Sequence, residues 1–421
     1  MNHPAPTRVH YRNGQLHLED CSLGDIARRF GTPCYVYSRA ALTVAYHDYR
    51  QVLQGHDALI CYAVKANANL AILNLFARLG AGFDIVSGGE LQRVLVAGGD
   101  PGKVVFSGVG KSRSDIEQAL RAGIHCFNVE SASELRRLND IAGQLGYKAP
   151  ISLRVNPDVD AKTHPYISTG LKNNKFGVAH AEALALYRQA ASLPHLHIRG
   201  IDCHIGSQLL DPAPALESAR KILDLTDALA ETGITLDHID LGGGLGIRYH
   251  DENVPSVADY LGPILALFAG RKEKLLVEPG RSLVGNAGLL LSRVEILKPG
   301  SERNFAIIDA AMNDLMRPAL YDAWHDILTV HERPAGPAQR YEIVGPVCES
   351  GDFIGHDRLL SLAEDGLLAI LSAGAYGMSM SSNYNSRPRA AEVMIDGTQC
   401  HLIRPREDIA QLYAGETLLP A

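Results

Sequence analysis

The sequence lacks most of the features that mark secreted, membrane-spanning or nucleic-acid-binding proteins. Its seven cysteines are scattered over 421 residues without Cys-x-x-Cys spacing, so we expect neither a disulfide framework nor a metal site. No segment approaches the roughly 18 consecutive apolar residues of a membrane span, and Met1–Gln15 has no apolar run of the signal-peptide type. A net charge of −7 without a basic block argues against nucleic-acid binding. We expect a globular protein of the reducing cytoplasm.

What the sequence does contain is a regular alternation of short β-branched runs with segments of helical period, beginning near residue 56. This alternation predicts parallel strands joined by right-handed crossovers through helices. Eight such units within about 250 residues match a closed (β/α)8 barrel, and a doubly wound open sheet is the alternative. The eight predicted strands are Ala58–Val64, Gly82–Val86, Lys103–Ser107, His125–Val129, Ile151–Val155, Ile198–His204, His238–Leu241 and Leu275–Val277.

After Gly285 the pattern changes to strands separated by turns, which is typical of a second, mostly antiparallel β domain. The strand-like runs Gln15–Leu18 and Cys34–Tyr37 fit either domain. We expect the barrel to span residues 36–284, and residues 1–35 with 285–421 to form a domain like a β-sandwich or β-barrel. Its predicted strands are Gly288–Leu297, Phe305–Ile308, Arg340–Val344, Leu367–Leu371 and Glu392–Ile395.

Polar residues follow the predicted barrel strands, at the ends where (β/α)8 barrels carry their catalytic groups. They are Lys65, Asp84, Ser107, Glu130, Arg154 with Asn156, His204, the Gly242–Gly244 turn and the Glu278–Arg281 turn. A lysine beside apolar walls can have the lowered pKa that imine formation with an aldehyde needs. Taken alone, however, Lys65 is more simply a surface lysine.

The turns after the sixth, seventh and eighth strands predict a phosphate site. Gly243 and Gly244 would let backbone N–H groups approach an anion, although a tight turn is the simpler use of such glycines. Gly280 with Arg281 can complete the site, since barrels often bind phosphate after strands seven and eight. Ser207 adds a hydroxyl donor.

Two further side chains suit a ring-shaped cofactor. Glu278 can bond a pyridine nitrogen and keep it protonated, which makes the ring a strong electron sink. His204 can stack on the ring face, and a hydrogen-bonded core histidine is an equally good interpretation. In the second domain, Cys348 stands between Val347 and Glu349 in a loop and is the best acid or nucleophile among the cysteines, while a lone cysteine is usually a packing residue.

Together these stretches resemble the diaminopimelate decarboxylases, within the alanine-racemase-like (fold type III) class of pyridoxal-phosphate enzymes. The resemblance covers nearly the whole chain. It rests on ordered motifs: Tyr62-Ala-Val-Lys-Ala-Asn67, His204-Ile-Gly-Ser-Gln208, Gly242-Gly-Gly244, Glu278-Pro-Gly-Arg281, Met316-Arg-Pro-Ala-Leu-Tyr321, Cys348-Glu-Ser-Gly-Asp352 and Gly374-Ala-Tyr-Gly377.

The resemblance implies a carboxy-lyase that converts meso-2,6-diaminopimelate to L-lysine and CO2, the last step of lysine biosynthesis. It implies pyridoxal 5′-phosphate on Lys65, with Cys348 as the proton donor to Cα. It also implies a homodimer whose shared sites take Cys348 and Glu349 from the second chain. The implied cofactor-binding residues are Lys65, Asp84, His204, Ser207, Gly243, Gly244, Glu278, Gly280, Arg281 and Tyr376, and the implied substrate-binding residues are Arg281, Arg317, Tyr321, Glu349 and Tyr376.

Three alternatives remain at this point. A related decarboxylase acting on ornithine, arginine, D-lysine or a carboxylated polyamine would not need Arg317, because an arginine reads a distal carboxylate. A racemase of the same class is disfavoured by Glu278. A cofactor-binding regulator without turnover would not need the second domain with Cys348.

Overall fold

A computed structural model describes residues 9–160, 175–332 and 336–421, and the chain divides into two compact units. One unit, here called the barrel unit, contains residues 45–247 and 253–282. The other, called the β unit, contains the residues up to 44, residues 248–252 and residues 283–421. Within the described ranges, no helix is both long enough and apolar enough to cross a membrane.

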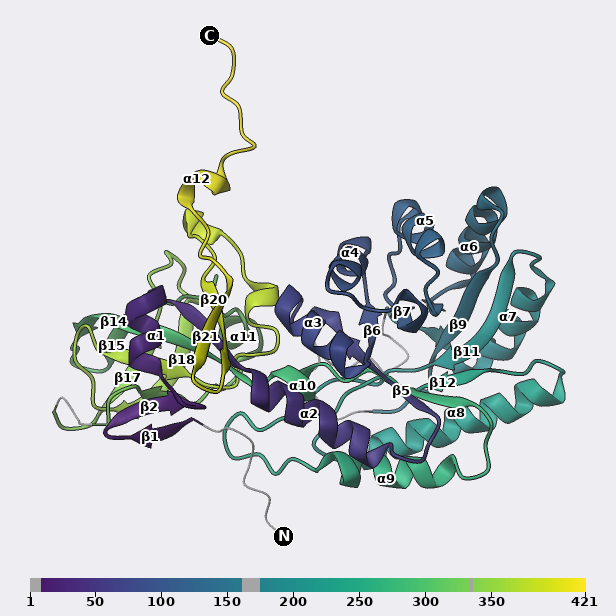
Figure 1. Ribbon diagram of the computed structural model, residues 1–421, viewed down its shortest axis with the longest axis horizontal. Helices are drawn as coiled ribbons and strands as arrows, with labels where there is room; N and C mark the ends of the chain where they lie inside the picture. The colour runs from purple at the N-terminus through teal and green to yellow at the C-terminus, as the bar shows by residue number, and fades with distance from the viewer. Residues whose placement is uncertain (1–8, 161–174, 333–335) are drawn as a thin grey trace. The chain divides into compact units, whose positions relative to one another are not determined.

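The barrel unit confirms the predicted closed barrel of parallel strands (Figure 1). Eight strands pair in the order β5-β6-β7-β8-β9-β11-β12-β13, and β13 pairs with β5 to close the ring. A short additional strand, β10, pairs with β9. Each predicted run coincides with one strand of the ring. The strands are β5 (Ala58–Ala63), β6 (Gly82–Ile85), β7 (Val104–Phe106), β8 (Cys126–Val129), β9 (Ala149–Asn156), β10 (Val178–Ala179), β11 (Leu196–Asp202), β12 (His238–Asp240) and β13 (Lys274–Val277).

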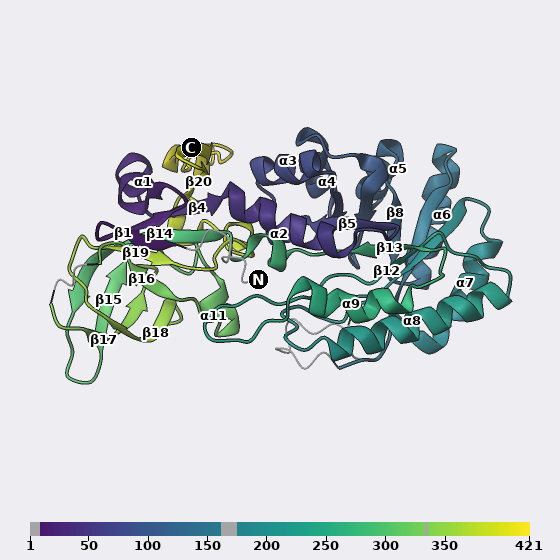
Figure 2. The same ribbon diagram turned by 60° about the horizontal axis from the view of Figure 1, so that its bottom comes forward.

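Helices cover the outside of the barrel, with α3 to α6 on one side of the strands and α8 and α9 on another (Figure 2). The helices bury the outer face of the strands and side chains fill the barrel interior, so the strands are apolar along most of their length. The helices are α3 (Leu70–Leu79), α4 (Gly88–Val96), α5 (Arg113–Ala122), α6 (Ala132–Leu145), α7 (His180–Ser192), α8 (Ala213–Glu231) and α9 (Val257–Leu267), with the 3-10 turns η1 (Val64–Ala66) and η2 (Pro101–Lys103).

Local sequence sets the ends of these helices. The side chains of Ser87, Ser112 and Ser131 accept hydrogen bonds from the third backbone N–H of α4, α5 and α6. Each such cap is worth about 1 kcal/mol. Gly123 and Gly146 end α5 and α6 in the left-handed conformation, which costs glycine little. The caps fix where each strand-to-helix loop begins, and these loops carry the candidate site.

The β unit confirms the predicted second sheet, which is mostly antiparallel. Its strand order is β18-β17-β15-β14-β4-β20-β21, with β19 pairing β14 and β16. Two pairs, β15 with β17 and β4 with β20, are parallel. The strands are β4 (Cys34–Ser38), β14 (Gly288–Lys298), β15 (Asn304–Ile308), β16 (Ile327–Thr329), β17 (Gln339–Val344), β18 (Phe353–Leu360), β19 (Leu367–Ile370), β20 (Ala391–Asp396) and β21 (Gln399–Arg404).

The N-terminal segment belongs to the β unit. A small antiparallel sheet of β1 (His10–Arg12), β2 (Gln15–Leu18) and β3 (Cys21–Ser22) leads into α1 (Leu23–Phe30). Leu16, Ile26 and Val36 pack in one buried cluster with Leu289 and Val393, so the core of this unit joins both ends of the chain.

The remaining helices are α2 (Arg39–Val52), α10 (Arg281–Val284), α11 (Arg317–Tyr321) and α12 (Ile409–Leu412), with η4 (Met378–Met380) and η5 (Tyr384–Ser386).

Candidate active site

Lys65 lies just beyond the end of β5, in the 3-10 turn η1. Its Nζ donates a hydrogen bond to Oδ2 of Asp84, at 2.8 Å. Asp84 comes from the neighbouring strand β6 and its side chain is fully buried, whereas 39% of the Lys65 side chain is exposed. The carboxylate therefore fixes the direction of the ammonium group and leaves part of it accessible.

Main-chain hydrogen bonds hold the loops around Lys65 together. The N–H of Ala63, at the end of β5, donates to the carbonyl of Pro279 after β13, at 3.1 Å. The N–H of Glu278 donates to the carbonyl of Gly242 after β12, at 2.7 Å. The strand ends that the sequence predicted to carry the site thus form one connected surface of the barrel unit.

The glycines after β12 have no room for a side chain. A Cβ on Gly243 would lie 2.3 Å from the carbonyl oxygen of Glu278. Gly244 has a φ of +119°, and a Cβ there would lie 2.8 Å from the carbonyl oxygen of Gly206. This turn therefore carries no side chain of its own, which is what a close approach of its backbone to an anion requires.

Arg281 and Ser207 meet beside that turn. The Nη2 and Nε atoms of Arg281 lie 3.0 and 3.3 Å from Oγ of Ser207. Ser207 follows β11, and Arg281 begins α10 directly after Gly280. The Arg281 residue is only 6% exposed. A buried guanidinium next to a hydroxyl group is suited to bind phosphate or carboxylate oxygens.

His204 follows β11 and contacts the same glycine turn. The N–H of Gly243 donates to its Nδ1, at 3.4 Å. Burial, followed by the charges of Arg154 and Lys65, lowers the pKa of the imidazole well below its ordinary value. The ring is therefore neutral near pH 7, and because Nδ1 accepts a hydrogen bond, the proton is assigned to Nε2.

Three buried acids converge at the ends of β11, β12 and β13. Carboxylate oxygens of Asp202, Asp240 and Glu278 all lie within 4.8 Å of one another. Burial is the main cause that raises the pKa of each, and the neighbouring carboxylates add to it. The pKa of Asp240 rises to about 7, and those of Asp202 and Glu278 rise well above their ordinary values. The acid cluster, as we call these three residues, therefore retains protons near neutral pH.

Arg154 partly balances the acid cluster. Its Nη1 donates to Glu130 at 3.0 Å, and its Nε lies 3.9 Å from Asp202. Among the residues that the structure describes, neither Oε1 of Glu278 nor Oδ2 of Asp240 has a hydrogen-bond partner. Buried polar atoms are nearly always paired in native proteins, so the free oxygen of Glu278 can accept from a protonated neighbour such as Asp240 or from a donor on a ligand.

The other predicted residues belong to the β unit. Arg317 begins α11, and its Nη1 donates to Nε2 of His325 at 2.8 Å. Since that nitrogen accepts, Nδ1 of His325 carries the proton and donates to the carbonyl of Leu371 at 2.7 Å. The guanidinium also lies 4.3 Å from the centre of the Tyr249 ring. Arg317 is thereby held rigidly, and Tyr321 ends the same short helix.

Cys348, Glu349 and Tyr376 lie in loops of the β unit. Cys348 is exposed, and its N–H donates to Oδ1 of Asn385 at 2.9 Å. Glu349 is also exposed. Tyr376 has a φ of 56°, a left-handed conformation that costs a residue with a side chain about 1–3 kcal/mol. Such strain persists only where the surrounding structure enforces it, and it often marks functional loops.

The sequence did not single out Asp202, Asp240 or the acid cluster. Both aspartates stand inside predicted apolar strands, in Ile201-Asp-Cys203 and Ile239-Asp-Leu241. A charged residue near the carboxyl end of a buried strand is the signal that would have identified them, because such a residue is rarely buried without a function or a partner.

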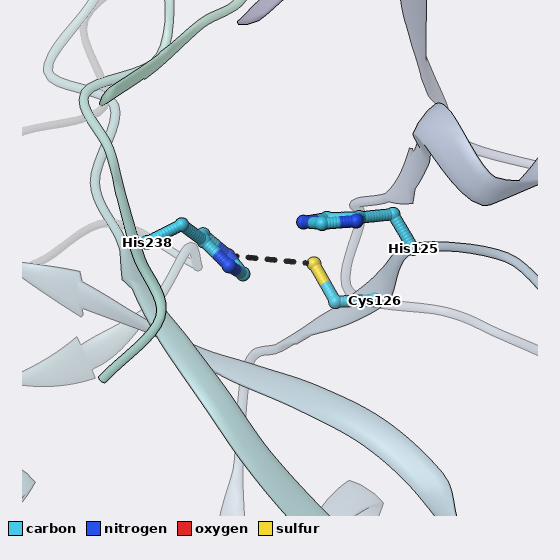
Figure 3. Close-up of side chains that lie close together, drawn as sticks. All are labelled: His125, Cys126 and His238. Carbon is cyan, nitrogen blue, oxygen red and sulfur yellow. Dashed lines mark hydrogen bonds between the residues drawn. The ribbon is translucent and has the colours of Figure 1, made fainter. Parts of the chain in front are cut away.

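A second group of potential metal ligands lies at the opposite, amino-terminal ends of the strands (Figure 3). Sγ of Cys126, in β8, lies 3.7 Å from Nε2 of His238, the first residue of β12. Burial, with a contribution from Arg199, lowers the pKa of His125 to about 4 and that of His238 to about 3. The nearby positive charge disfavours a cation, and we interpret this group as packing at the base of the barrel.

Comparisons with known proteins show the family to which the chain belongs. A family model described as "Pyridoxal-dependent decarboxylase, pyridoxal binding domain" matches residues 39–285. The chain is 60% identical over 410 residues to the diaminopimelate decarboxylase of Pseudomonas aeruginosa, covering 97% of this chain and 99% of that protein. It is 57% identical to that of Vibrio cholerae over 97% of this chain and 98% of the relative.

Solved structures extend the similarity to three dimensions. The diaminopimelate decarboxylase of Helicobacter pylori complexed with L-lysine matches with a TM-score of 0.90 and 43% identity, over 93% of this chain and 98% of that one. The enzyme of M. jannaschii in co-complex with L-lysine matches with a TM-score of 0.93 and 40% identity, over 98% of both chains. The chain therefore belongs to the pyridoxal-dependent decarboxylases, and within them to the family of the diaminopimelate decarboxylases.

Proposed function

We propose that this chain removes one carboxylate from meso-2,6-diaminopimelate, giving L-lysine and CO2, with pyridoxal 5′-phosphate held on Lys65. The observation that carries the proposal is the connected surface at the strand ends of the barrel unit. There, the Lys65–Asp84 pair, the Ser207–Arg281 pair and Glu278 are joined through hydrogen-bonded loops. This set provides an amine, an anion site and a buried acid in one place.

The donor set fits the cofactor. The free Oε1 of Glu278 would accept a hydrogen bond from the ring nitrogen, and the neutral, flat imidazole of His204 would stack on the ring. When bound, the cofactor supplies an electron sink for the negative charge that CO2 leaves on Cα. The phosphate would be held by Ser207, Gly243, Gly244, Gly280, Arg281 and Tyr376.

Glu278 would be able to supply a proton to its ligand because burial, followed by the charges of neighbouring carboxylates, raises its pKa. A carboxyl group that is protonated near neutral pH can pass that proton to a bound pyridine nitrogen. The carboxylate that remains would then keep the nitrogen protonated. Asp84 has a different role: its hydrogen bond directs Nζ of Lys65 at the end of β5.

Arg317 is suited to bind the distal carboxylate of the substrate. Its contacts with His325 and Tyr249 fix the guanidinium before a ligand arrives, so little side-chain entropy is lost on binding. We propose that Arg281, Tyr321 and Tyr376 complete this end of the site, and that Glu349 binds the distal ammonium group.

Cys348 would donate the proton that replaces CO2 on Cα. Its exposure in the β unit suits a residue that acts on a site outside its own loop. We propose that Cys348 and Glu349 act in the active site of the partner chain of a homodimer, and that the enzyme works in the cytoplasm.

Substrate choice tests the proposed reaction directly. We expect the purified protein to release CO2 from meso-diaminopimelate and to act weakly on L-ornithine, L-arginine and D-lysine. None of these three has the distal carboxylate that Arg317 would bind. A Lys65→Ala variant is the matched control and should release none. Faster CO2 release from ornithine, arginine or D-lysine would assign the chain to a related decarboxylase instead.

Chemical trapping tests the role of Lys65 separately. Reduction of the holoenzyme with borohydride should fix the mass of the cofactor on the peptide that contains Lys65. Lys111 is an internal control, because it lies in the same unit but is buried and hydrogen-bonded to Glu134. Cofactor mass on Lys111, or on any lysine other than Lys65, would refute the assignment.

A further inference from the structure

Two free cysteines from distant parts of the sequence lie against each other in the β unit. Sγ of Cys400, in β21, lies 3.2 Å from Sγ of Cys21, the first residue of β3. Cys21 in turn donates to the carbonyl of Gly397, at 3.6 Å. A disulfide bond needs a sulfur–sulfur distance of about 2.05 Å, so small side-chain rotations would bring the two atoms into bonding range.

The backbone holds this pair in place. The N–H of Asp20 donates to the carbonyl of Gly397 at 3.3 Å, and the N–H of Gly397 donates to Oε2 of Glu19 at 2.6 Å. Cys400 also pairs with Ile395 in the β20–β21 hairpin. Hydrogen bonds between residues 19–20 and Gly397 thus hold the two backbone segments together. The contact between the two thiols therefore does not depend on side-chain conformation alone.

The two thiols differ in accessibility. Both line a cavity of about 230 Å³, which offers an approach for a small reagent. Cys400 is partly exposed and Cys21 is only 8% exposed. Burial, together with the neighbouring Cys400, raises the pKa of the Cys21 thiol to about 12. Thiolates are the reactive form, so Cys400 is expected to react first.

We propose that Cys21 and Cys400 form a redox site that a small peroxide converts to an intramolecular disulfide. The sulfur of Cys400 attacks hydrogen peroxide, the O–O bond breaks, and one water molecule leaves as Cys400 becomes a sulfenic acid. The sulfur of Cys21 then attacks that of Cys400, the S–O bond breaks, and the proton of Cys21 leaves with the hydroxide as a second water molecule. Two thiols and one peroxide thus give one disulfide and two water molecules.

This redox site is independent of the proposed decarboxylation, because β3 and β21 carry none of the residues assigned to that reaction. The bond would join the N-terminal sheet to the hairpin near the C-terminus. Proximity favours the second step, whereas the raised pKa of Cys21 slows it, so the bond should form gradually and should be reversed by a dithiol.

Peptide mapping tests the proposal on the holoenzyme. The protein is treated with hydrogen peroxide, the excess is removed with catalase, and the sample is digested without reductant. We expect a disulfide-linked peptide pair containing Cys21 and Cys400, an intact mass lower by two hydrogens, and loss of the link after dithiothreitol treatment. Recovery of Cys21 as a free thiol while Cys400 carries sulfinic acid would overturn the proposal.

Two variants sharpen the result. Cys400→Ser should abolish the link and leave Cys21 unoxidised, because Cys21 is buried. Cys348→Ser removes a more exposed thiol that lies elsewhere in the β unit and should leave the link unchanged. A link that disappears in Cys348→Ser, or that joins two copies of the chain, would show that the pair is not the site of oxidation. Circular dichroism establishes that both variants are folded.

Discussion

From the acid cluster we predict how the free energy of unfolding depends on pH, and this prediction can be tested without measuring enzymatic activity. Asp240 is completely buried, and its pKa in the folded protein is about 7, against an ordinary value of 3.8. Burial is the first cause of this shift, and the charge of Asp84 adds to it. The folded state therefore holds a proton on Asp240 at pH values where the unfolded chain has released it.

The sign and size of the effect follow from this difference. Between pH 3.8 and pH 7 the folded state binds more protons than the unfolded state, so the free energy of unfolding falls as the pH rises. A shift from 3.8 to about 7, at 1.36 kcal/mol per unit, amounts to about 4 kcal/mol over the whole range. More than half of this is lost between pH 5 and pH 8, and the loss levels off above the folded pKa.

Asp240→Asn removes the titrating group with little change in shape. Asn can still accept the hydrogen bond that Gly242 donates to Oδ1 at 2.9 Å. Its new N–H group can also face the unpaired oxygen of Glu278. In cofactor-free protein, we expect the free energy of unfolding of the variant to fall by a few kcal/mol less than that of the wild type between pH 5 and pH 8.

Denaturant unfolding of the cofactor-free wild type and of Asp240→Asn at pH 5 and pH 8 measures this difference. Asp224→Asn is the matched control, because Asp224 is an exposed aspartate on α8 of the same unit. The control should follow the pH dependence of the wild type. If the stability of Asp240→Asn has the same pH dependence as that of Asp224→Asn, then Asp240 does not hold its proton in the folded state, and the acid cluster does not retain protons near neutral pH.

Two substitutions test the residues assigned in the β unit. Cys348→Ala should lower kcat by about 100-fold or more, as the loss of a general acid does, while the absorbance of the bound cofactor stays the same; an unchanged kcat would exclude Cys348 as the proton donor. Arg317→Ala should raise KM for meso-diaminopimelate by about 10–100-fold, because one charge-assisted contact is worth roughly 1.5–3 kcal/mol, and should leave cofactor affinity nearly unchanged. Equal losses of substrate and cofactor binding would indicate damage to the β unit, where His325 and Tyr249 hold Arg317.

Much of the barrel could be predicted from the sequence because its strands are buried on both faces. Such strands appear as short, continuous apolar runs, and helices such as α5 and α6 begin at serine caps and end at glycine. Lys65 and Glu278 became candidates by position, because they directly follow predicted strands, whereas the roles of the site residues came from the family resemblance. This reasoning predicts which residues share an edge of the barrel, but it does not give their contacts.

What the sequence did not reveal depends on contacts between distant residues. The strands β18 and β21 were not predicted, because Gly355 with His356 and Asp357 interrupts the first, and half of the second is polar and none of it is buried. The parallel pairing of β4 with β20 joins segments more than 350 residues apart, and no local pattern encodes it.

Ionisation of the acid cluster is expected to affect both the stability of the folded protein and the stabilisation that it gains from the bound cofactor. Its buried carboxylates cost stability when they ionise without a partner, and Arg154 contacts only part of the group. A bound pyridine nitrogen would be able to accept the proton of Glu278. The Glu278 carboxylate formed as the pH rises would then lie beside a protonated ring nitrogen and would not be buried without a partner. The stabilisation gained from the cofactor should therefore be larger at pH 8 than at pH 5. Glu278→Gln should reduce this difference, because a glutamine amide does not titrate in this pH range. A gain that is the same at both pH values in the wild type would mean that Glu278 does not titrate with the cofactor.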